Sequence, residues 1–327
     1  MKILLTGATG FLGSAVARAL LKNQYQVCAL VLPGDPAPGL DGLPVELIAG
    51  DVLRPETLGP ALAGCQGVVH AAGRVNLRAC GRDAMHRLNV EGSRLVARAA
   101  KAAGVRRFIH ISSVGVLGAH LVPRTVDEAH PAPDAARQKH HYHVSKLAAE
   151  TAVAAELHGC VETVTILPTM LWGPGDWALS STGYALRALQ GKTIYYTTRG
   201  GTCILDVEDA AAGVAAALSR GRAGERYVLA GENVTIEAWC RLLVEAAGQP
   251  SPVKPVSLAA ITALGLVAEG LGRLGLDIDF SLDLRRQTGN YWWADGSKAE
   301  KELGFKPAYT AREAIFRSVA WLRKNRL

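Results

Sequence analysis

Short apolar segments alternate with longer segments of helical periodicity along the first half of the chain. Runs of Val, Ile, Leu and Ala between turn residues predict buried strands, and apolar residues spaced three and four apart predict helices. The predicted strands are Lys2–Thr6, Tyr25–Leu32, Val45–Ala49, Gly67–His70, Arg107–Ile111 and Glu162–Leu167. The predicted helices lie near Phe11–Lys22, Pro55–Leu62, Asp83–Ala103 and Tyr142–Leu157, and Gly104 and Gly159 follow where a left-handed residue ends a helix. This order is typical of an α/β fold with a doubly wound parallel sheet.

The pattern loosens after Pro168. The segment WGPGDWALSSTG, residues 172–183, is rich in turn residues that continue neither a strand nor a helix. A strand near Thr202–Leu205 and a helix at Val207–Ser219 are expected to return to the main sheet. We therefore predict a large domain over residues 1–170, to which residues 202–220 return, and a smaller C-terminal lobe from residues 171–201 and 221–327. Residues 33–44 and 123–139 are expected to form surface loops.

The composition is that of an ordinary globular protein. Of the 327 residues, 49% are hydrophobic and 20% are charged, which argues against a disordered or fibrous chain. Lys2 follows Met1 directly and glycines interrupt the first apolar stretch, so we expect no signal peptide and a cytoplasmic location. The apolar stretch Ser257–Ala268 is shorter than the ~20 residues of a membrane span. It predicts a buried or interfacial amphipathic helix.

Charge and cysteine usage disfavour two classes of ligand. The net charge of +7 would suit nucleic acid, but no Lys/Arg run of five and no basic–aromatic interleaving is present. The six cysteines are scattered, without spacing that suits zinc, so no metal site is expected. His140, His141 and His143 diverge on a helix, which favours exposed imidazoles at a loop-to-helix junction over metal ligands. A homodimer stays open.

Gly7, Gly10 and Gly13 lie between the first strand and the first helix. In this position glycines permit a tight turn, a close approach of backbone to a pyrophosphate and close helix–strand packing, and the helix N-terminus faces the phosphates. A glycine-rich turn can also be only a turn. The strand before it and the helix after it favour a Rossmann-type site for NAD or NADP.

The adenosine end of this site is ambiguous. An acid at the end of the second strand favours NAD and an arginine there favours NADP, but the strand ends at Leu32, and Asp35 comes slightly late. Asp51, after the third strand, is placed to contact the adenine edge or to cap a turn. The choice between NAD and NADP stays open.

Tyr142 and Lys146 are four residues apart, on one face of a predicted helix. A tyrosine becomes an acid–base group near neutral pH when an ammonium stabilises its phenolate, and it can then exchange a proton with a carbonyl oxygen. The Y-x-x-x-K spacing is common by chance. Ser112 and Ser113, at the end of a predicted strand, belong to the sheet edge where ligands bind and so add weight to this pair.

Several motifs together resemble the extended short-chain dehydrogenases/reductases, and most closely their dihydroflavonol-reductase-like and 3β-hydroxysteroid-dehydrogenase-like branch. The motifs are TGATGFLG, AGD at 49–51, VVHAAG at 68–73, LNVEGS at 88–93, ISSVGVLG at 111–118, YHVSK at 142–146, LPTMLWGPGD at 167–176, LDVEDAAAG at 205–213 and YWWADGSKAEKELGFKP at 291–307. The resemblance covers nearly the whole chain. The chain departs from it at Leu32, where many reductases of this branch have arginine.

The resemblance implies roles for individual residues. Ser113 would orient a carbonyl, Tyr142 would be the general acid/base, and Lys146 would lower the pKa of the tyrosine and hold the nicotinamide ribose. Ala71, Ala72 and Gly73 would line the cofactor, and the backbone from Pro168 to Leu171 would meet the nicotinamide amide. The full set of expected cofactor contacts is Gly7, Thr9, Gly10, Phe11, Leu12, Gly13, Leu32, Asp51, Val52, Ala71, Ala72, Gly73, Ser112, Tyr142, Lys146, Pro168 and Leu171.

The combined interpretation is an NAD(P)-dependent ketone reductase or secondary alcohol dehydrogenase with a small, fairly apolar substrate. Trp172, Trp177, Tyr184, Tyr291, Trp292 and Trp293 are candidates for an aromatic substrate wall or for the core of the lobe. Two alternatives remain: a nucleotide-sugar epimerase or dehydratase that retains NAD, and a cofactor-binding regulatory protein without turnover.

Overall fold

The main sheet of the computed structural model is parallel and has seven strands in the order β11-β7-β5-β4-β1-β2-β3. The structure describes residues 1–76, 78, 80–131, 140–274, 276 and 281–326. The strands are β1 (Lys2–Thr6), β2 (Gln26–Val31), β3 (Glu46–Ala49), β4 (Gly67–His70), β5 (Arg107–Ile111), β7 (Glu162–Pro168) and β11 (Arg226–Leu229). The order reverses beside β1, as in doubly wound dinucleotide-binding folds. The α/β fold expected from the sequence is confirmed.

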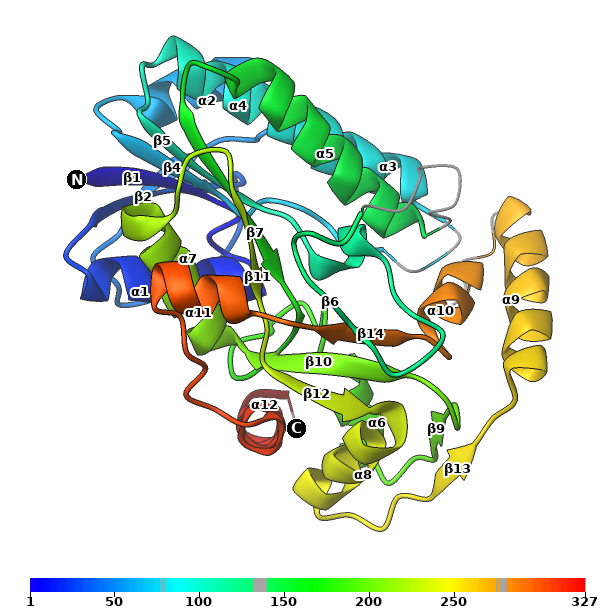
Figure 1. Ribbon diagram of the computed structural model, residues 1–327. Helices are drawn as coiled ribbons and strands as arrows, with labels where there is room; N and C mark the ends of the chain where they lie inside the picture. Colours follow the sequence, from blue (N-terminus) through cyan, green and yellow to red (C-terminus); the bar gives the residue numbers. More distant parts are fainter. Residues whose placement is uncertain (77, 79, 132–139, 275, 277–280, 327) are drawn as a thin grey trace.

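Helices cover both faces of this sheet (Figure 1). One layer contains α1 (Phe11–Lys22), α7 (Val207–Arg220) and α11 (Ser297–Leu303), and the other contains α2 (Pro55–Leu62), α4 (Ser93–Ala102) and α5 (His141–Leu157). Alternate strand residues enter the two cores: Ile3 and Leu5 pack on the side of α1 and α7, and Leu4 packs on the side of α2 and α4. Because both faces are covered, the strands are nearly continuous apolar runs.

The predicted helix Asp83–Ala103 is interrupted. It consists of α3 (Arg82–His86), the π-helical segment η2 (Arg87–Gly92) and α4. A π-helical turn places one extra residue in the helix and is often found at functional sites. Gly104 and Gly159 have φ of 69° and 70°, the left-handed conformation that the sequence predicts at these helix ends.

A second, mixed sheet carries the rest of the chain. It has the order β12-β10-β14-β6, and β8 pairs with β10. Its strands are β6 (Thr125–Val126), β8 (Met170–Trp172), β10 (Gly201–Asp206), β12 (Glu232–Thr235) and β14 (Tyr291–Ala294), with the separate pair β9 (Ile194–Tyr196) and β13 (Val253–Pro255). The remaining helices are α6 (Gly183–Leu189), α8 (Ile236–Ala247), α9 (Leu258–Arg273), α10 (Leu282–Gln287) and α12 (Ala311–Arg326), and η1 (Pro38–Leu40) and η3 (Val114–Leu117) are short helical turns.

The expected return of the strand near Thr202–Leu205 to the main sheet is wrong. This strand is β10, and it pairs with β8 and β12 in the second sheet. The place beside β7 is taken by β11, whose Tyr227, Val228 and Leu229 are fully buried. The helix that follows β10 does pack on the main sheet as expected, because α7 lies against α1. Sequence periodicity cannot distinguish which of two short apolar strands continues a sheet.

Replacing Ile109 by alanine should destabilise the main sheet. The side chain is fully buried on β5, in the core on the α1 side. A cavity at such a site lowers the free energy of unfolding by about 2–5 kcal/mol. Urea denaturation measures this free energy. Leu47→Ala is the control, because Leu47 on β3 is 53% exposed, and its replacement should change stability by at most about 0.5 kcal/mol. Equal losses in the two variants would contradict this prediction.

Candidate active site

The segments that follow β1, β4 and β5 meet at one edge of the main sheet, because the carboxyl ends of parallel neighbouring strands lie side by side. The glycine turn follows β1, residues 71–73 follow β4, and Ser112 and Ser113 follow β5. The helix α5 begins with His141 and presents Tyr142 and Lys146 in its first turns. The three neighbouring strands thus place the predicted site residues at a common edge.

Two glycines of this turn, Gly7 and Gly13, have no room for a side chain. Gly7 has φ of +68°, and a Cβ on it would lie 2.5 Å from the Ala72 nitrogen. A Cβ on Gly13 would lie 1.9 Å from the Gly7 carbonyl oxygen. Gly10 is the N-cap of α1, where no side chain caps the helix and no acid lies in the first turn. An uncapped, acid-free N-terminus with close backbone fits the pyrophosphate of a dinucleotide.

The adenosine end contains a contact that the sequence did not indicate. Thr9, within the glycine turn, donates its hydroxyl to the Asp35 carboxylate at 2.8 Å, and the same carboxylate accepts the Ala37 N–H at 2.9 Å. Asp35 therefore lies at the glycine turn although it comes late in the sequence. Leu32 is 54% exposed at the end of β2. No Lys or Arg occurs between residues 23 and 53.

Asp51 and Val52 have structural contacts of their own. The Asp51 carboxylate accepts the Leu53 N–H at 2.8 Å, the turn-capping arrangement that was one of the two interpretations. Val52 is buried in the core on the α2 side, against Gly92. Phe11 is buried in the other core, whereas Leu12 is half-buried beside it. Contacts of these residues with a cofactor stay predictions.

Tyr142 is brought to Ser113. The Ser113 hydroxyl lies close enough to the phenol to affect its pKa. Burial of the phenol raises the pKa of Tyr142 to about 12, and the nearby Ser113 hydroxyl opposes this rise. The Ser113 hydroxyl also accepts the Gly115 N–H at 3.2 Å, which begins η3. A phenol and a hydroxyl held together at this edge can both contact one substrate oxygen.

Lys146 is buried next to the segment after β4. Its Nζ donates to the Ile111 carbonyl oxygen at 2.6 Å, and a Cβ on Gly73 would lie 3.6 Å from it. Burial lowers the pKa of Lys146 to about 8, and the negative charge of Glu150 opposes this fall.

Glu150 was not expected as part of the site. It lies one helical turn after Lys146 on α5. Its carboxylate accepts a hydrogen bond from the Ser112 hydroxyl and forms an ion pair with Arg226 at 3.2 Å. Burial raises the pKa of Glu150, and Arg226, Ser112 and Lys146 lower it. The Ser112 hydroxyl, predicted to contact the cofactor, is thus already engaged. Only the i, i+4 spacing from Lys146 could have indicated Glu150.

Asn89 connects the segment after β4 to α5. It lies in η2, accepts the Arg74 N–H at 2.8 Å, and donates to the Arg74 carbonyl and to Ser145 Oγ at 3.0 and 2.9 Å. The Ser145 hydroxyl in turn donates to the Tyr142 carbonyl at 2.7 Å. The side chain thus supports both Gly73 and the first turn of the helix that carries Tyr142.

The expectation of exposed imidazoles around Tyr142 is wrong for two of the three histidines. His140 and His143 are buried, and the centroids of their stacked rings lie 4.1 Å apart. The His143 ring also packs on Gly115 and beside Trp292 of β14. The exposed His141 has Nδ1 3.0 Å from Asp283 of α10. Burial alone would raise the pKa of Asp283, but His141, His140 and Arg286 lower it to about 2.

The remaining predicted residues divide between the main domain and the lobe. Pro168 ends β7 beside Leu229, and Leu171 lies in β8 opposite Leu205. Of the predicted aromatic wall, Trp172 is fully buried in the lobe core with Trp239, and Tyr184 packs on the same Trp239. Trp292 is the aromatic residue that contacts a histidine next to Tyr142. Ala71 and Ala72 are half-buried beside Gly7.

Comparisons with known proteins point to one family. Residues 3–230 match the model of the NAD dependent epimerase/dehydratase family. A dihydroflavonol 4-reductase-like protein of Synechocystis is 31% identical, over 98% of this chain and 94% of its own. The sterol demethylase protein B of Methylococcus capsulatus is 29% identical, over 99% of both chains.

Two further similarities concern a ketoreductase and a solved structure. The 4-hydroxy-2-methyl-3-oxo-4-farnesyl-3,4-dihydroquinoline-1-oxide ketoreductase of Stigmatella aurantiaca is 29% identical, over 96% of this chain and 95% of its own. The crystal structure of gox2253 superposes with a TM-score of 0.87 at 33% identity, over 99% of this chain and 98% of the other.

Glu150→Gln should change the pH dependence of catalysis. Loss of the carboxylate charge lowers the pKa of Lys146 below about 8, so the ammonium is lost at lower pH. The alkaline limb of kcat/KM should therefore move to lower pH. Glu156→Gln is the matched control, because Glu156 lies on the outer side of the same helix and pairs with Arg94 and Arg98. An unmoved limb in Glu150→Gln, or an equal shift in the control, would contradict this role.

Proposed function

Because the chain belongs to the NAD dependent epimerase/dehydratase family, we propose that it is an NAD(P)-dependent ketone reductase or secondary alcohol dehydrogenase. The observation that carries the proposal is the Tyr142 phenol held near the Ser113 hydroxyl at the sheet edge where Lys146 is buried. A glycine turn in which Gly7 and Gly13 have no room for a side chain lies at the same edge. Reductase names among the relatives support this choice within the family.

The proposed mechanism uses the chain's own groups for proton transfer and orientation. The turn Gly7–Gly13 and the segment Ala71–Gly73 would hold NAD(H), which would supply or accept the hydride. Ser113 donates a hydrogen bond to the carbonyl oxygen, and Tyr142 delivers the proton to that oxygen. The Lys146 ammonium stabilises the phenolate that remains. In the reverse direction Tyr142 takes the proton from the alcohol.

The substrate is proposed to be a fairly apolar small molecule that carries a ketone or a secondary alcohol. Trp292, next to His143, supplies an aromatic surface near Tyr142. The relatives named for sterol and farnesyl-quinoline chemistry act on apolar molecules, which supports the same class here. We propose that the lobe formed within residues 171–201 and 221–327, apart from β11 and α11, supplies the substrate side of the site through residues that face Tyr142, such as Trp292.

The cofactor is proposed to be NAD rather than NADP. The Asp35 carboxylate lies at Thr9, and the segment around it contains no cation that could receive a 2′-phosphate. A negative carboxylate near the adenosine ribose favours a hydroxyl over a phosphate by charge repulsion.

Tyr142→Phe should abolish turnover and leave cofactor binding intact. Removal of a positioned acid–base group costs about 10²–10⁴-fold in rate. The turnover rate is measured from the absorbance of NADH as it is oxidised in the presence of a panel of apolar ketones. Fluorescence titration with NADH checks cofactor binding. Undiminished ketone reduction would exclude this mechanism. If the wild-type protein oxidises no added NADH but epimerises or dehydrates a nucleotide sugar, the retained-cofactor alternative within the family is correct.

Asp35→Asn should weaken the preference for NADH. The substitution removes the charge and keeps an oxygen that accepts the Thr9 hydroxyl. The ratio of kcat/KM for NADPH to that for NADH should rise at least about fivefold, because the repulsion between two unit charges about 4 Å apart is about 1 kcal/mol even in water. Asp41→Asn in the same loop is the control and should leave the ratio unchanged. A wild-type preference for NADPH would refute the assignment.

A further inference from the structure

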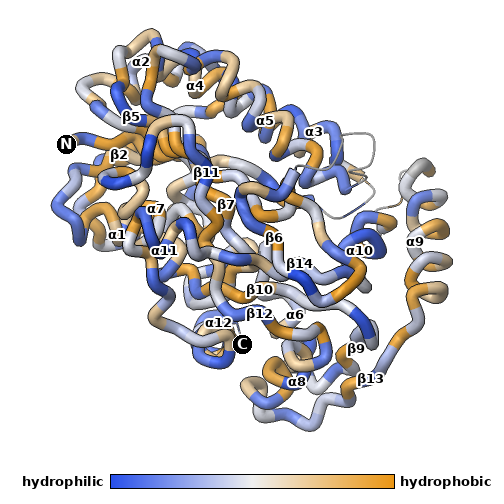
Figure 2. The backbone as a smooth tube through the Cα atoms, in the orientation of Figure 1, coloured by the Kyte–Doolittle hydropathy of each residue, from blue (hydrophilic) through white to orange (hydrophobic). Residues whose placement is uncertain are grey.

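The described side chains on the outward side of α9 are apolar. Its exposed residues, called here the outer face, are Ala259, Ala260, Ala263, Leu264, Leu266, Val267 and Gly270. Leu264 and Val267 are 57% and 59% exposed, and Leu274 just after the helix is 77% exposed. Among the described side chains of α9, none on this face is polar. The helix stands at the margin of the molecule (Figure 1), and the tube is coloured hydrophobic along much of it (Figure 2).

The opposite side of α9 holds its polar contacts. Glu269 forms two hydrogen bonds with Arg82, at 2.9 and 2.5 Å, and Thr262 accepts one from Arg285 at 2.9 Å. Ile261 and Ala268 are buried. An ordinary surface helix places its polar residues outward and its apolar stripe inward. This helix directs polar groups inward and a contiguous apolar surface outward, which marks an interaction site.

Exposed basic residues flank the first turn of α9. Arg199 and Lys254 form this basic rim. Arg199 donates to the Gly289 carbonyl, and Gly289 packs on Leu258, the first residue of the helix. Lys254 lies opposite Tyr195 across the pair β9–β13. Residues 177–205 contain no Asp or Glu. Tyrosine and lysine beside an apolar surface are typical of the boundary between lipid and water.

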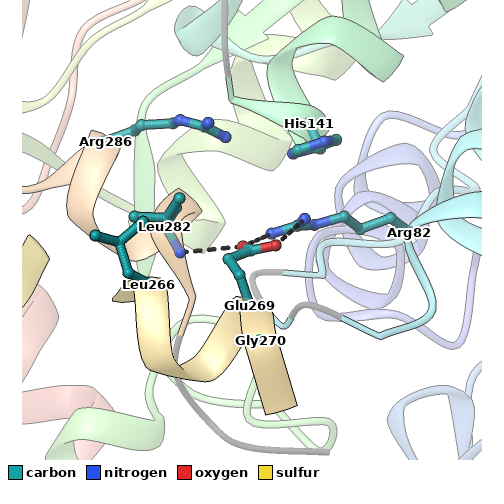
Figure 3. A pocket seen from close by; sticks show the side chains of 7 residues that line it. All are labelled: Arg82, His141, Leu266, Glu269, Gly270, Leu282 and Arg286. Carbon is teal, nitrogen blue, oxygen red and sulfur yellow. Dashed lines mark hydrogen bonds and ion pairs between the residues drawn. The ribbon is translucent and has the colours of Figure 1, made fainter. Parts of the chain in front are cut away.

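A cavity of about 300 Å³ borders one edge of the outer face (Figure 3). Leu266, Glu269 and Gly270 of α9 form one wall, and Leu282 and Arg286 of α10 form another. Arg82 and His141 also line it, and His141 directly precedes Tyr142. The cavity therefore lies between this edge of the outer face and the start of the helix that carries the candidate catalytic tyrosine.

We propose that α9 lies on the surface of an anionic lipid bilayer, with its outer face among the acyl chains and the basic rim among the headgroups. The helix has 16 residues, fewer than the ~20 of a span but enough for an interfacial helix. No described helix is long and apolar enough to cross a membrane. A second copy of the chain would bring an identical basic rim, whereas anionic lipid complements it.

Docking in this way would bring the cavity to the lipid surface. An apolar ketone dissolved in the bilayer would then reach the site without crossing water. This consequence rests on the proposed reductase function, but the docking itself does not.

Co-sedimentation of the full chain with vesicles tests the docking without any turnover. The wild-type protein should co-sediment with vesicles of phosphatidylglycerol and phosphatidylcholine. Its affinity for vesicles of pure phosphatidylcholine should be at least about fivefold lower, since each basic residue near an anionic surface contributes about that factor. Leu264→Glu combined with Val267→Glu should weaken binding at least about tenfold, because a buried apolar contact becomes a charge.

Leu47→Glu is the matched control, since Leu47 is similarly exposed on β3 at the far edge of the main sheet and should bind vesicles as the wild type does. Reduction of a short water-soluble ketone should be unchanged in the Leu264/Val267 variant, which separates failure of docking from failure of the reductase assignment. Absence of vesicle binding by the wild type, or equal loss in Leu47→Glu, would overturn the proposal. So would a wild-type dimer in sedimentation equilibrium that the double variant dissociates, because a second copy would then cover the face.

Discussion

The close approach of the first turn to its neighbours constrains the whole N-terminal domain. Gly7 lies against the backbone of Ala71 and Ala72, and Gly13 lies against the Gly7 carbonyl, at separations that no Cβ could occupy. This packing brings the uncapped start of α1 to the segment after β4. The same segment ends at Gly73, next to Lys146. The pyrophosphate position and the candidate catalytic helix are therefore set by one contact between two βα turns.

Buried charge at the start of α5 is tolerated because each group has a partner from another element. Asp283 of α10 meets His141, Glu150 meets Ser112 and Arg226, and Lys146 meets the Ile111 carbonyl. Unpaired buried charges are costly, so these pairs specify one position for the helix. The His141–Asp283 pair also joins α5 to α10, and Arg82 pairs with Glu269 of α9, which carries the proposed lipid-binding face. The candidate chemistry and the candidate interaction surface share this region.

Much of the main domain was predictable from local pattern. Strands buried on both faces are continuous apolar runs, so β1, β2, β4 and β5 were identified with nearly their observed bounds. The turn after β1 was identifiable because only glycine suits such a close backbone contact. The membership of β10 and β11 in their sheets was not predictable, because both are short and apolar. Which one pairs with β7 depends on the twist and crossovers of the completed sheets.

The sequence by itself determined the α/β class, the glycine turn and the spacing of Tyr142 and Lys146, because each depends on residues close together in the chain. Only the tertiary structure decided which groups surround them. Asp35 reaches Thr9, Glu150 reaches Ser112, and two histidines expected in solvent are buried by β14 and η3. It also turned the apolar side of α9 outward. These outcomes depend on contacts between distant segments, and burial sets the charge of each group only after those contacts form.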